Sequence, residues 1–260
     1  MQTGFAFSKL ADHLANLAEL TADDLDLLTK MPSTIAHFGS HQAILRHGDA
    51  SNQCCLLLQG YLSWQDAYGS EGQITSISVP GDIADLRTLY RPCIDGNLIA
   101  LGPAVVAFVP HRCLRELSIR SPAISRALLL MLIGDHAIQR NWTINLGSRD
   151  ALTRAAHLLC EITARLQNVG LARDFRLSSP FTQSDLAAAC SISPVHANRT
   201  IQELRRCNLL HWHGKTLTIP DWPGLVRLAR FDPAYLGLRR RDQTPQQAQS
   251  GAARADVVPA

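Results

Sequence analysis

The stretch "TQSDLAAACSISPVHANRTIQELRR", from Thr182 to Arg206, decides the fold expected for this chain. Thr182 can cap a short helix, because its hydroxyl can accept a backbone hydrogen bond and Asp185 follows three positions later as a capping-box acid. After the tight turn "SIS", Ser193 can cap a second helix, and Pro194 fits the first helical position, where no backbone N–H is needed. Two short helices joined by a tight turn predict a helix-turn-helix.

The second predicted helix separates into an inward and an outward face. Ala197, Ile201 and Leu204 recur at helical spacing and predict a buried stripe, which can meet Leu186 and Ala189 of the first helix. The side chains left on the outward face suit base edges, since Arg can bond guanine, Asn and Gln can bond adenine, and an apolar Val can touch the thymine methyl. The predicted base-reading residues are Val195, Asn198, Arg199 and Gln202.

A β wing is predicted directly after this helix. The stretch "NLLHWHGKTLTI" (Asn208–Ile219) reads as two strands with a turn at His213–Lys215, whose imidazole and ammonium groups suit contact with phosphate. A small helical pair with a polar solvated face would explain any one of these residues. The combination of caps, turn, second helix and wing favours DNA binding.

The charge distribution agrees with a polyanion partner for the C-terminal half. Residues 1–120 hold 8 Lys/Arg and 12 Asp/Glu, whereas residues 121–260 hold 17 and 10. A basic module attracts polyanions, although chance and the three consecutive arginines at 239–241 would also give this imbalance.

The rest of the chain predicts an α+β protein. A helix is expected over Leu17–Pro32 with Thr21 as its cap, and short β-rich runs separated by Gly and Asp turns between residues 37 and 117 predict an antiparallel sandwich or roll. The expected organisation is an N-terminal antiparallel β-roll sensor domain (1–120), a long dimerisation helix (121–148), a C-terminal winged helix-turn-helix (149–238) and a disordered tail (239–260).

The helix expected between Pro122 and Gly147 has apolar residues at spacings of three and four. Such a helix can pair with a second copy of the chain, or it can be buried within one subunit. We expect it to form a homodimer, through the stripe Leu128, Met131, Leu132, Asp135, Ile138 and Trp142.

The cysteines and apolar runs predict a cytoplasmic protein without a membrane partner. Seven cysteines stand at irregular spacing without a CxxC pair, which is typical of reduced thiols. Strand alternation is expected to point one of Cys54 and Cys55 inward and the other outward. The N-terminus has no signal-peptide pattern, and the longest apolar run, Ala127–Ile133, is too short to span a bilayer.

The stretch from Phe181 to Ile219 resembles, without a gap, the winged helix-turn-helix of the Crp/Fnr family of bacterial transcription regulators. The stretches "HGDASNQCCLLLQGYLSW" and "GQITSISVPGDIADL" resemble the β-roll of that family, which is of the cyclic-nucleotide-binding type, and the likeness covers roughly residues 15–225. The resemblance implies a homodimer that reads a palindrome in double-stranded DNA. If the protein activates transcription, it also implies contact with RNA polymerase through the loop Leu171–Ser179.

Individual residues match the family's DNA contacts. Arg199 matches its guanine-reading Arg, and Val195 replaces a Glu that commonly accepts a bond from cytosine, so we expect a different half-site, with a T opposite Val195. The expected phosphate contacts are Thr182, Ser184, Ser193, His196 and His213, matched by resemblance, and Lys215 of the wing.

The sequence predicts no cofactor and no enzyme activity. Where nucleotide-binding members hold the cyclic phosphate with Gly-Glu-Leu and Arg-Ser, this chain has "ADL" (Ala84–Leu86) and Gly96–Asn97, so the cation is missing and cyclic AMP is not expected. No Cys precedes Cys54, which argues against an iron–sulfur cluster. No nucleophile–base motif or phosphate loop stands out. The alternative function is a small-molecule or redox sensor acting mainly through protein contacts.

The histidines and cysteines of the chain are not expected to form a metal or redox site. Scattered histidines in a roll are more often hydrogen-bonded or solvated than metal-bound, and scattered cysteines are more often core, although an exposed one could sense oxidation. The histidines concerned are His37, His41, His47 and His111, and the cysteines are Cys54, Cys55, Cys190 and Cys207.

Overall fold

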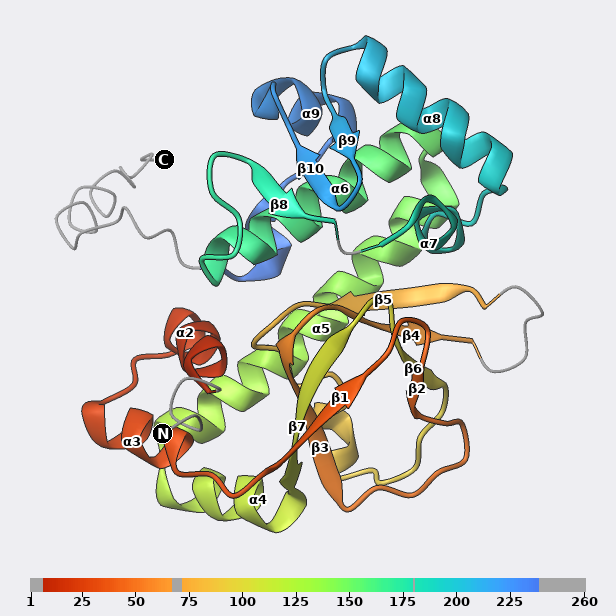
Figure 1. The fold of residues 1–260 in the computed structure, drawn as a ribbon. Coiled ribbons are helices and arrows are strands. Elements are labelled where there is room, and N and C mark those ends of the chain that lie inside the picture. The colour runs from red at the N-terminus through yellow and green to blue at the C-terminus, as the bar shows by residue number, and fades with distance from the viewer. Residues whose placement is uncertain (1–6, 67–71, 180, 239–260) are drawn as a thin grey trace, which may run out of the picture.

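The structure is a computed structural model that describes residues 7–66, 72–179 and 181–238. The predicted tail, residues 239–260, lies outside the described residues. Figure 1 shows a β-rich part, a long helix that runs upward from it, and a C-terminal module at the far end of that helix. Within the described ranges, no helix has the length and apolar character needed to cross a membrane.

Two antiparallel sheets form the β-rich part. One has the strand order β1-β7-β3, and the other has the order β2-β6-β4-β5. Apolar side chains such as Leu57, Leu62 and Val106 fill the space between them. The predicted antiparallel roll and the α+β class are therefore confirmed. The strands are β1 (Thr34–Phe38), β2 (Ala43–Leu45), β3 (Gln53–Gln59), β4 (Leu62–Gln65), β5 (Ile74–Ser78), β6 (Asn97–Ala100) and β7 (Ala104–Pro110).

Helices cover the outer face of the sheet that contains β3 and β7, so this sheet is buried on both sides. Cys54 packs under the helices and Cys55 between the sheets, and both are buried. The expectation that one of them would face outward is wrong, because the sequence pattern of the strand does not show that a second layer covers it. The covering elements are α2 (Ser8–Leu17), α3 (Ala22–Thr29), the short η1 (Leu86–Leu89), α4 (His111–Arg120) and the start of α5 (Pro122–Ser148).

Gly81 allows α2 to pack closely on the roll. Its φ of +100° belongs to the region that favours glycine, and a Cβ at this position would lie 2.6 Å from the backbone oxygen of Lys9. The close approach places α2 beside Asp82, the residue that follows Gly81.

The long helix α5 begins and ends at clear local signals. Ser121 caps it by accepting a hydrogen bond from the Ile124 N–H, and Pro122 takes the first helical position. It ends at Ser148, where Arg149 is extended and Asp150 caps the next helix by accepting a bond from the Thr153 N–H. α5 thus connects the roll to the C-terminal module without a long linker (Figure 1).

The C-terminal module combines helices with a three-stranded sheet of order β8-β10-β9. The sequence predicted the β9–β10 hairpin but treated Leu171–Ser179 as a loop. Part of that segment forms β8, because Leu177 pairs with Leu217 and both side chains are buried. The elements are α6 (Ala151–Asn168), β8 (Arg176–Ser178), α7 (Gln183–Ala189), α8 (Pro194–Arg206), β9 (His211–His213), β10 (Thr216–Thr218), α9 (Trp222–Ala229) and η2 (Pro233–Leu236).

An aromatic cluster closes this module on the side of α6. His157 of α6 is buried and stacks on Tyr235, with ring centroids 5.9 Å apart, while Phe231 meets it edge-on at 5.3 Å. Burial first, and the charge of Arg149 second, lower the pKa of His157 to about 4. The folded protein therefore keeps this imidazole neutral at neutral pH.

This histidine predicts a loss of stability in acid. An unfolded His has a pKa of about 6.5, so the unfolded chain binds more protons between about pH 6.5 and pH 4, and His157 contributes a loss of up to about 3 kcal/mol as the pH falls through this window. We expect His157→Phe to remove this contribution. Between pH 7 and pH 4 the unfolding free energy of the variant should therefore fall by less than that of the wild type, and the difference between the two falls should equal this amount. Urea denaturation at a series of pH values measures the difference, and parallel curves for the two proteins would contradict the assignment.

Candidate DNA-binding surface

Helices α7 and α8 form the predicted helix-turn-helix, and their caps are the predicted ones. Thr182 and Asp185 form a full capping box at α7. Ser193 caps α8 by accepting a hydrogen bond from the His196 N–H, with Pro194 at the first position. Between the helices, Ser191 adopts a φ of +48°, which turns the chain sharply enough for the two helices to pack.

The inward face of α8 is confirmed. Ala197, Ile201 and Leu204 are fully buried, and Ile201 and Leu204 belong to the same core as Leu186 and Ala189 of α7. Since this stripe is held in the core, the opposite side of α8 must face away from the module. Figure 1 shows α8 at the outer edge of the C-terminal module, on the side away from the roll.

The outward face of α8 carries the four side chains predicted to read bases. Val195 is 66% exposed, so its methyl groups are open to contact with a partner. Arg199 forms no ion pair within the described part of the chain, so its guanidinium can bond a partner. All four are exposed, namely Val195, Asn198, Arg199 and Gln202.

The residues predicted to contact phosphate are also exposed, and they surround this face. They occupy the N-terminus of α7, the N-terminus of α8 and the tip of the β9–β10 hairpin. At the tip, Trp212 Nε1 donates a hydrogen bond to the Gly214 carbonyl over 3.1 Å, which fixes the turn between His213 and Lys215. The exposed set is Thr182, Ser184, Ser193, His196, His213 and Lys215.

Other cations near α8 hold the module together, and sequence reasoning did not single them out. Arg154 of α6 donates to the Cys190 carbonyl over 2.6 Å and to the Arg149 carbonyl over 3.1 Å, tying the turn of the helix-turn-helix to the end of α5. Arg205 donates to the Trp212 carbonyl. Their partners are backbone carbonyls distant in sequence or brought close only by folding, so no local pattern identifies them.

The helix α5 uses the predicted dimerisation stripe mostly for its own subunit. Leu128, Met131, Ile138 and Trp142 are buried within the chain, Leu132 is half-buried, and Asp135 is exposed. The roll and α6 occupy this side of the helix. A different apolar face is left open, because Leu129, Ile133 and Ile144 are 57%, 54% and 44% exposed.

An open hollow of about 690 Å³ lies between β4, β5, the turn that follows β5, and α5. Both arginines in its described lining are already paired with carboxylates. Arg87 donates to Asp95 over 3.0 Å and lies over the ring of Trp64, and Arg165 donates to Asp82 over 2.6 Å. In the described lining of the hollow, the guanidinium groups of both arginines are thus already engaged by carboxylates.

A further carboxyl group, that of Asp135, belongs to the same lining. Asp135 is reached by solvent, yet the protein around it and the carboxylate of Asp82 raise its pKa to about 7. Within the described residues, no group of three or more His, Cys, Asp or Glu side chains could hold a metal ion.

The cysteines divide into buried and exposed groups. Burial raises the pKa of the thiols of Cys54, Cys55 and Cys190, which disfavours the reactive thiolate. Cys207 at the end of α8 is exposed, as is Cys93 in the roll.

Known proteins with similar sequences are transcription regulators. Residues 153–228 match the Crp-like helix-turn-helix domain. The chain is 23% identical over 211 residues to the anaerobic regulatory protein of Haemophilus influenzae, covering 80% of this chain and 81% of that one. It is 24% identical over 212 residues to the transcriptional activator protein FnrA of Stutzerimonas stutzeri, covering 81% of this chain and 86% of that one.

Solved structures share the fold. FixK2 from Bradyrhizobium japonicum superimposes with a TM-score of 0.68 at 18% identity, covering 76% of this chain and 98% of that one. A CRP-family transcriptional regulator from Thermus thermophilus, TTHB099, gives 0.59 at 18% identity, covering 75% and 97%. At this identity the likeness establishes the architecture of roll, long helix and C-terminal module.

Proposed function

This chain belongs to the Crp/Fnr family of transcription regulators, and on that premise we propose that it binds a palindromic DNA operator as a homodimer. The recognition helix is α8, which enters the major groove with its outward face toward the base edges. Enrichment of one palindrome from a pool of random duplexes by the purified, reduced protein tests this proposal.

The outward face of α8 is the observation that carries the proposal. It presents an exposed apolar side chain, an amide and a guanidinium beside one another, on a helix whose other side is fixed in the core. Arg199 suits a bidentate contact with guanine, and Val195 suits the methyl group of thymine. Exposed hydroxyl, imidazole and ammonium groups around this face suit the phosphates on either side.

The open apolar face of α5 supports the homodimer. Leu129, Ile133 and Ile144 lie at helical spacing on the side of α5 that its own subunit leaves uncovered. Two such helices packed along this face would bury these side chains and relate the two recognition helices by a two-fold axis. Recognition helices about 34 Å apart would then reach successive major grooves.

The segment Leu171–Ser179 remains the proposed contact with RNA polymerase if the protein activates transcription. It begins with Leu171, which is 43% exposed, and continues into β8. This assignment rests on family analogy.

We expect Lys215→Ala to weaken binding to all DNA sequences about equally. The exposed ammonium at the tip of the hairpin neutralises one phosphate in each half-site and carries no sequence information. The slope of log affinity against log salt should therefore become shallower by about one for each half-site. Binding titrations at several salt concentrations measure it, with Lys30→Ala as the control, because Lys30 directly follows α3 and lies outside the C-terminal module. An effect confined to one base pair would contradict the assignment.

A further inference from the structure

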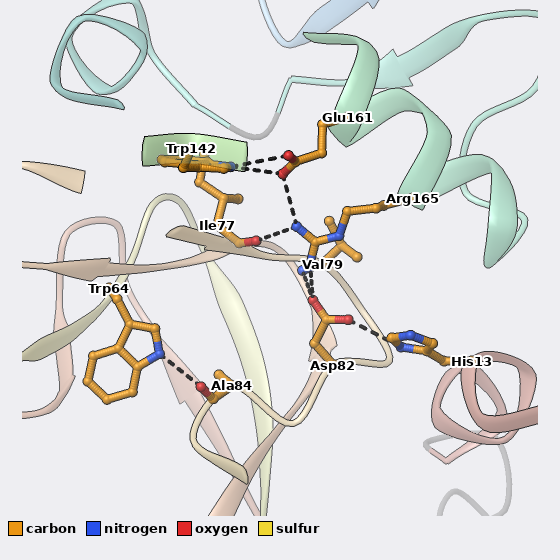
Figure 2. Close-up of polar contacts among 9 residues, drawn as sticks. All are labelled: His13, Trp64, Ile77, Val79, Asp82, Ala84, Trp142, Glu161 and Arg165. Carbon is orange, nitrogen blue, oxygen red and sulfur yellow. Dashed lines mark hydrogen bonds and ion pairs between the residues drawn. The ribbon is translucent and has the colours of Figure 1, made fainter. Parts of the chain in front are cut away.

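A buried polar network lies at the junction of the roll, α2, α5, α6 and the C-terminal segment, and Figure 2 shows the part of it formed by the roll, α2, α5 and α6. Its residues come from segments far apart in the sequence, and its three charged members Asp82, Glu161 and Arg165 are all buried. We refer to the following six residues as the junction network: His13, Asp82, Trp142, Glu161, Arg165 and Tyr235.

Arg165 of α6 is the centre of the network. One guanidinium nitrogen donates to Asp82 Oδ2 over 2.6 Å, and another donates to the Ile77 carbonyl over 2.8 Å. Both acceptors belong to the roll, whereas Arg165 belongs to the C-terminal module. A single planar side chain therefore fixes two points of the roll relative to α6, as Figure 2 shows.

Glu161, one helical turn before Arg165, extends the network to the other side of the junction. It lies 3.6 Å from Arg165 and accepts hydrogen bonds from Trp142 Nε1 of α5, over 3.1 and 3.2 Å. It also accepts a bond of 2.8 Å from the hydroxyl of Tyr235 in η2. Its carboxylate thus joins the long helix and the C-terminal segment to the helix that carries Arg165.

Asp82 is the residue of the roll whose carboxylate faces both α6 and α2. His13 Nδ1 of α2 lies 3.2 Å from Asp82 Oδ1. The other oxygen, Oδ2, which accepts from Arg165, also accepts from the Val79 N–H over 2.8 Å. Burial alone would raise the pKa of Asp82, but Arg165 and His13 hold it below its ordinary value. The carboxylate is therefore ionised, and its Oδ2 is bonded by Arg165 and by the Val79 N–H when the module is docked.

The junction network need not add net stability to constrain the geometry of the junction. Well-packed apolar residues can replace a buried ion pair at little net cost, but a displaced partner leaves a buried charge without compensation. Tilting the C-terminal module on the roll would separate Arg165 from Asp82 and the Ile77 carbonyl together. The docked orientation is consequently the one in which every buried charge of the network has its partners.

We propose that Arg165 is a positioning residue that sets the orientation of the DNA-binding module on the roll and α5, and thereby the spacing of the two recognition helices in the dimer. This inference rests on the proposed function. Arg165 bonds residues of the roll and not of α8. It therefore affects whether the dimer can bind both half-sites at the same time, and it leaves the base preference unchanged.

The two exposed cysteines provide a direct measurement of this orientation. Cys93 lies in the roll and Cys207 at the end of α8, and the other five cysteines are buried. Nitroxide labels on Cys93 and Cys207 would report the distance between the modules by pulsed electron paramagnetic resonance. Mixing labelled protein with an excess of unlabelled protein restricts the signal to labelled pairs within one subunit.

We expect the Arg165→Met variant to broaden or shift the distance distribution that is narrow in the wild type. Its affinity for the selected operator should fall at least tenfold, while its affinity for non-specific DNA stays within twofold. The matched control is Arg115→Met, since Arg115 also donates to a backbone carbonyl, that of Leu89, but both ends lie in the roll. The control should keep the wild-type distance and the wild-type operator affinity.

An unchanged distance distribution in Arg165→Met with wild-type operator affinity would overturn the proposal. So would an equal loss of specific and non-specific affinity. If Arg165→Met does not fold, Arg165→Lys takes its place, because a single ammonium retains the buried charge but lacks the planar fork that reaches Asp82 and the Ile77 carbonyl together. It should broaden the distribution in the same way, and a wild-type distribution would overturn the proposal.

The DNA selection with wild-type protein separates this inference from the function on which it rests. If the wild type enriches an operator and Arg165→Met behaves like the wild type, only the role of Arg165 fails. If the wild type enriches no sequence, the proposed function itself fails.

Discussion

We expect the Arg199→Ala variant to bind the proposed operator with an affinity lowered by about 1–3 kcal/mol for each half-site, and to tolerate other bases at the position that Arg199 is proposed to read. The physical reason is the bidentate contact that an exposed guanidinium can make with the O6 and N7 atoms of guanine, which alanine cannot replace. Because a homodimer presents this side chain twice, the effect on a palindrome counts both half-sites. Fluorescence anisotropy with operators that carry each of the four bases at this position measures both the loss and the relaxed preference.

Arg227→Ala is the matched control for this prediction. Arg227 is an exposed arginine of α9 in the same module, so its removal changes the net charge equally. It should leave the base preference unchanged and lower the affinity only slightly. A loss in Arg199→Ala that is equal for operator and random DNA would show that Arg199 contacts only phosphate.

We expect the Ile133→Glu variant to be a monomer that no longer binds the proposed operator tightly. Ile133 is 54% exposed in the middle of the open face of α5, between Leu129 and Ile144. Packing two such faces together would remove two glutamates from water, at a cost of several kcal/mol. Without the dimer, only one recognition helix can bind at a time, so binding to one half-site no longer raises the affinity for the other. Sedimentation and operator titration measure the two effects.

Ile119→Glu is the control for the dimer face. Ile119 on α4 is even more exposed, at 82%, but it lies outside α5. The same chemical change there should leave both the dimer and the operator affinity intact. A dimeric Ile133→Glu protein would show that the subunits associate through another surface.

The helix-turn-helix could be predicted from the sequence because its signals are local. Thr182 and Asp185 stand three residues apart, as do Ser193 and the N–H that it caps, and the inward stripe of α8 has helical spacing. Each of these interactions is decided within one turn of helix, so a sequence pattern is sufficient to find it.

The partner of each face of α5 could not be predicted in the same way. The helix has one apolar stripe through Leu128 and Met131 and a second through Leu129 and Ile133. Periodicity shows that both exist but does not show which one the roll and α6 cover. The structure places the first stripe in the subunit's own core, so the proposed dimer face is the second.

The contacts of the junction network were even less predictable from the sequence. His13, Asp82 and Arg165 are separated by 69 and 83 residues along the chain, and they meet only after the roll, α2 and α6 have packed. A charged residue in a sequence is usually a solvated one, and nothing next to Arg165 indicates that it is buried. Such interactions can be found only in the folded molecule.

Selection of bound duplexes from a random DNA pool tests the central claim most directly. The purified, reduced protein is used at near-physiological salt without added ligand. We expect enrichment of one palindrome with half-site centres about one helical turn apart, and with a G in each half-site whose recognition is lost in Arg199→Ala. Enrichment of no sequence, or of single sites without two-fold symmetry, would contradict the claim that two copies of α8 read an operator together.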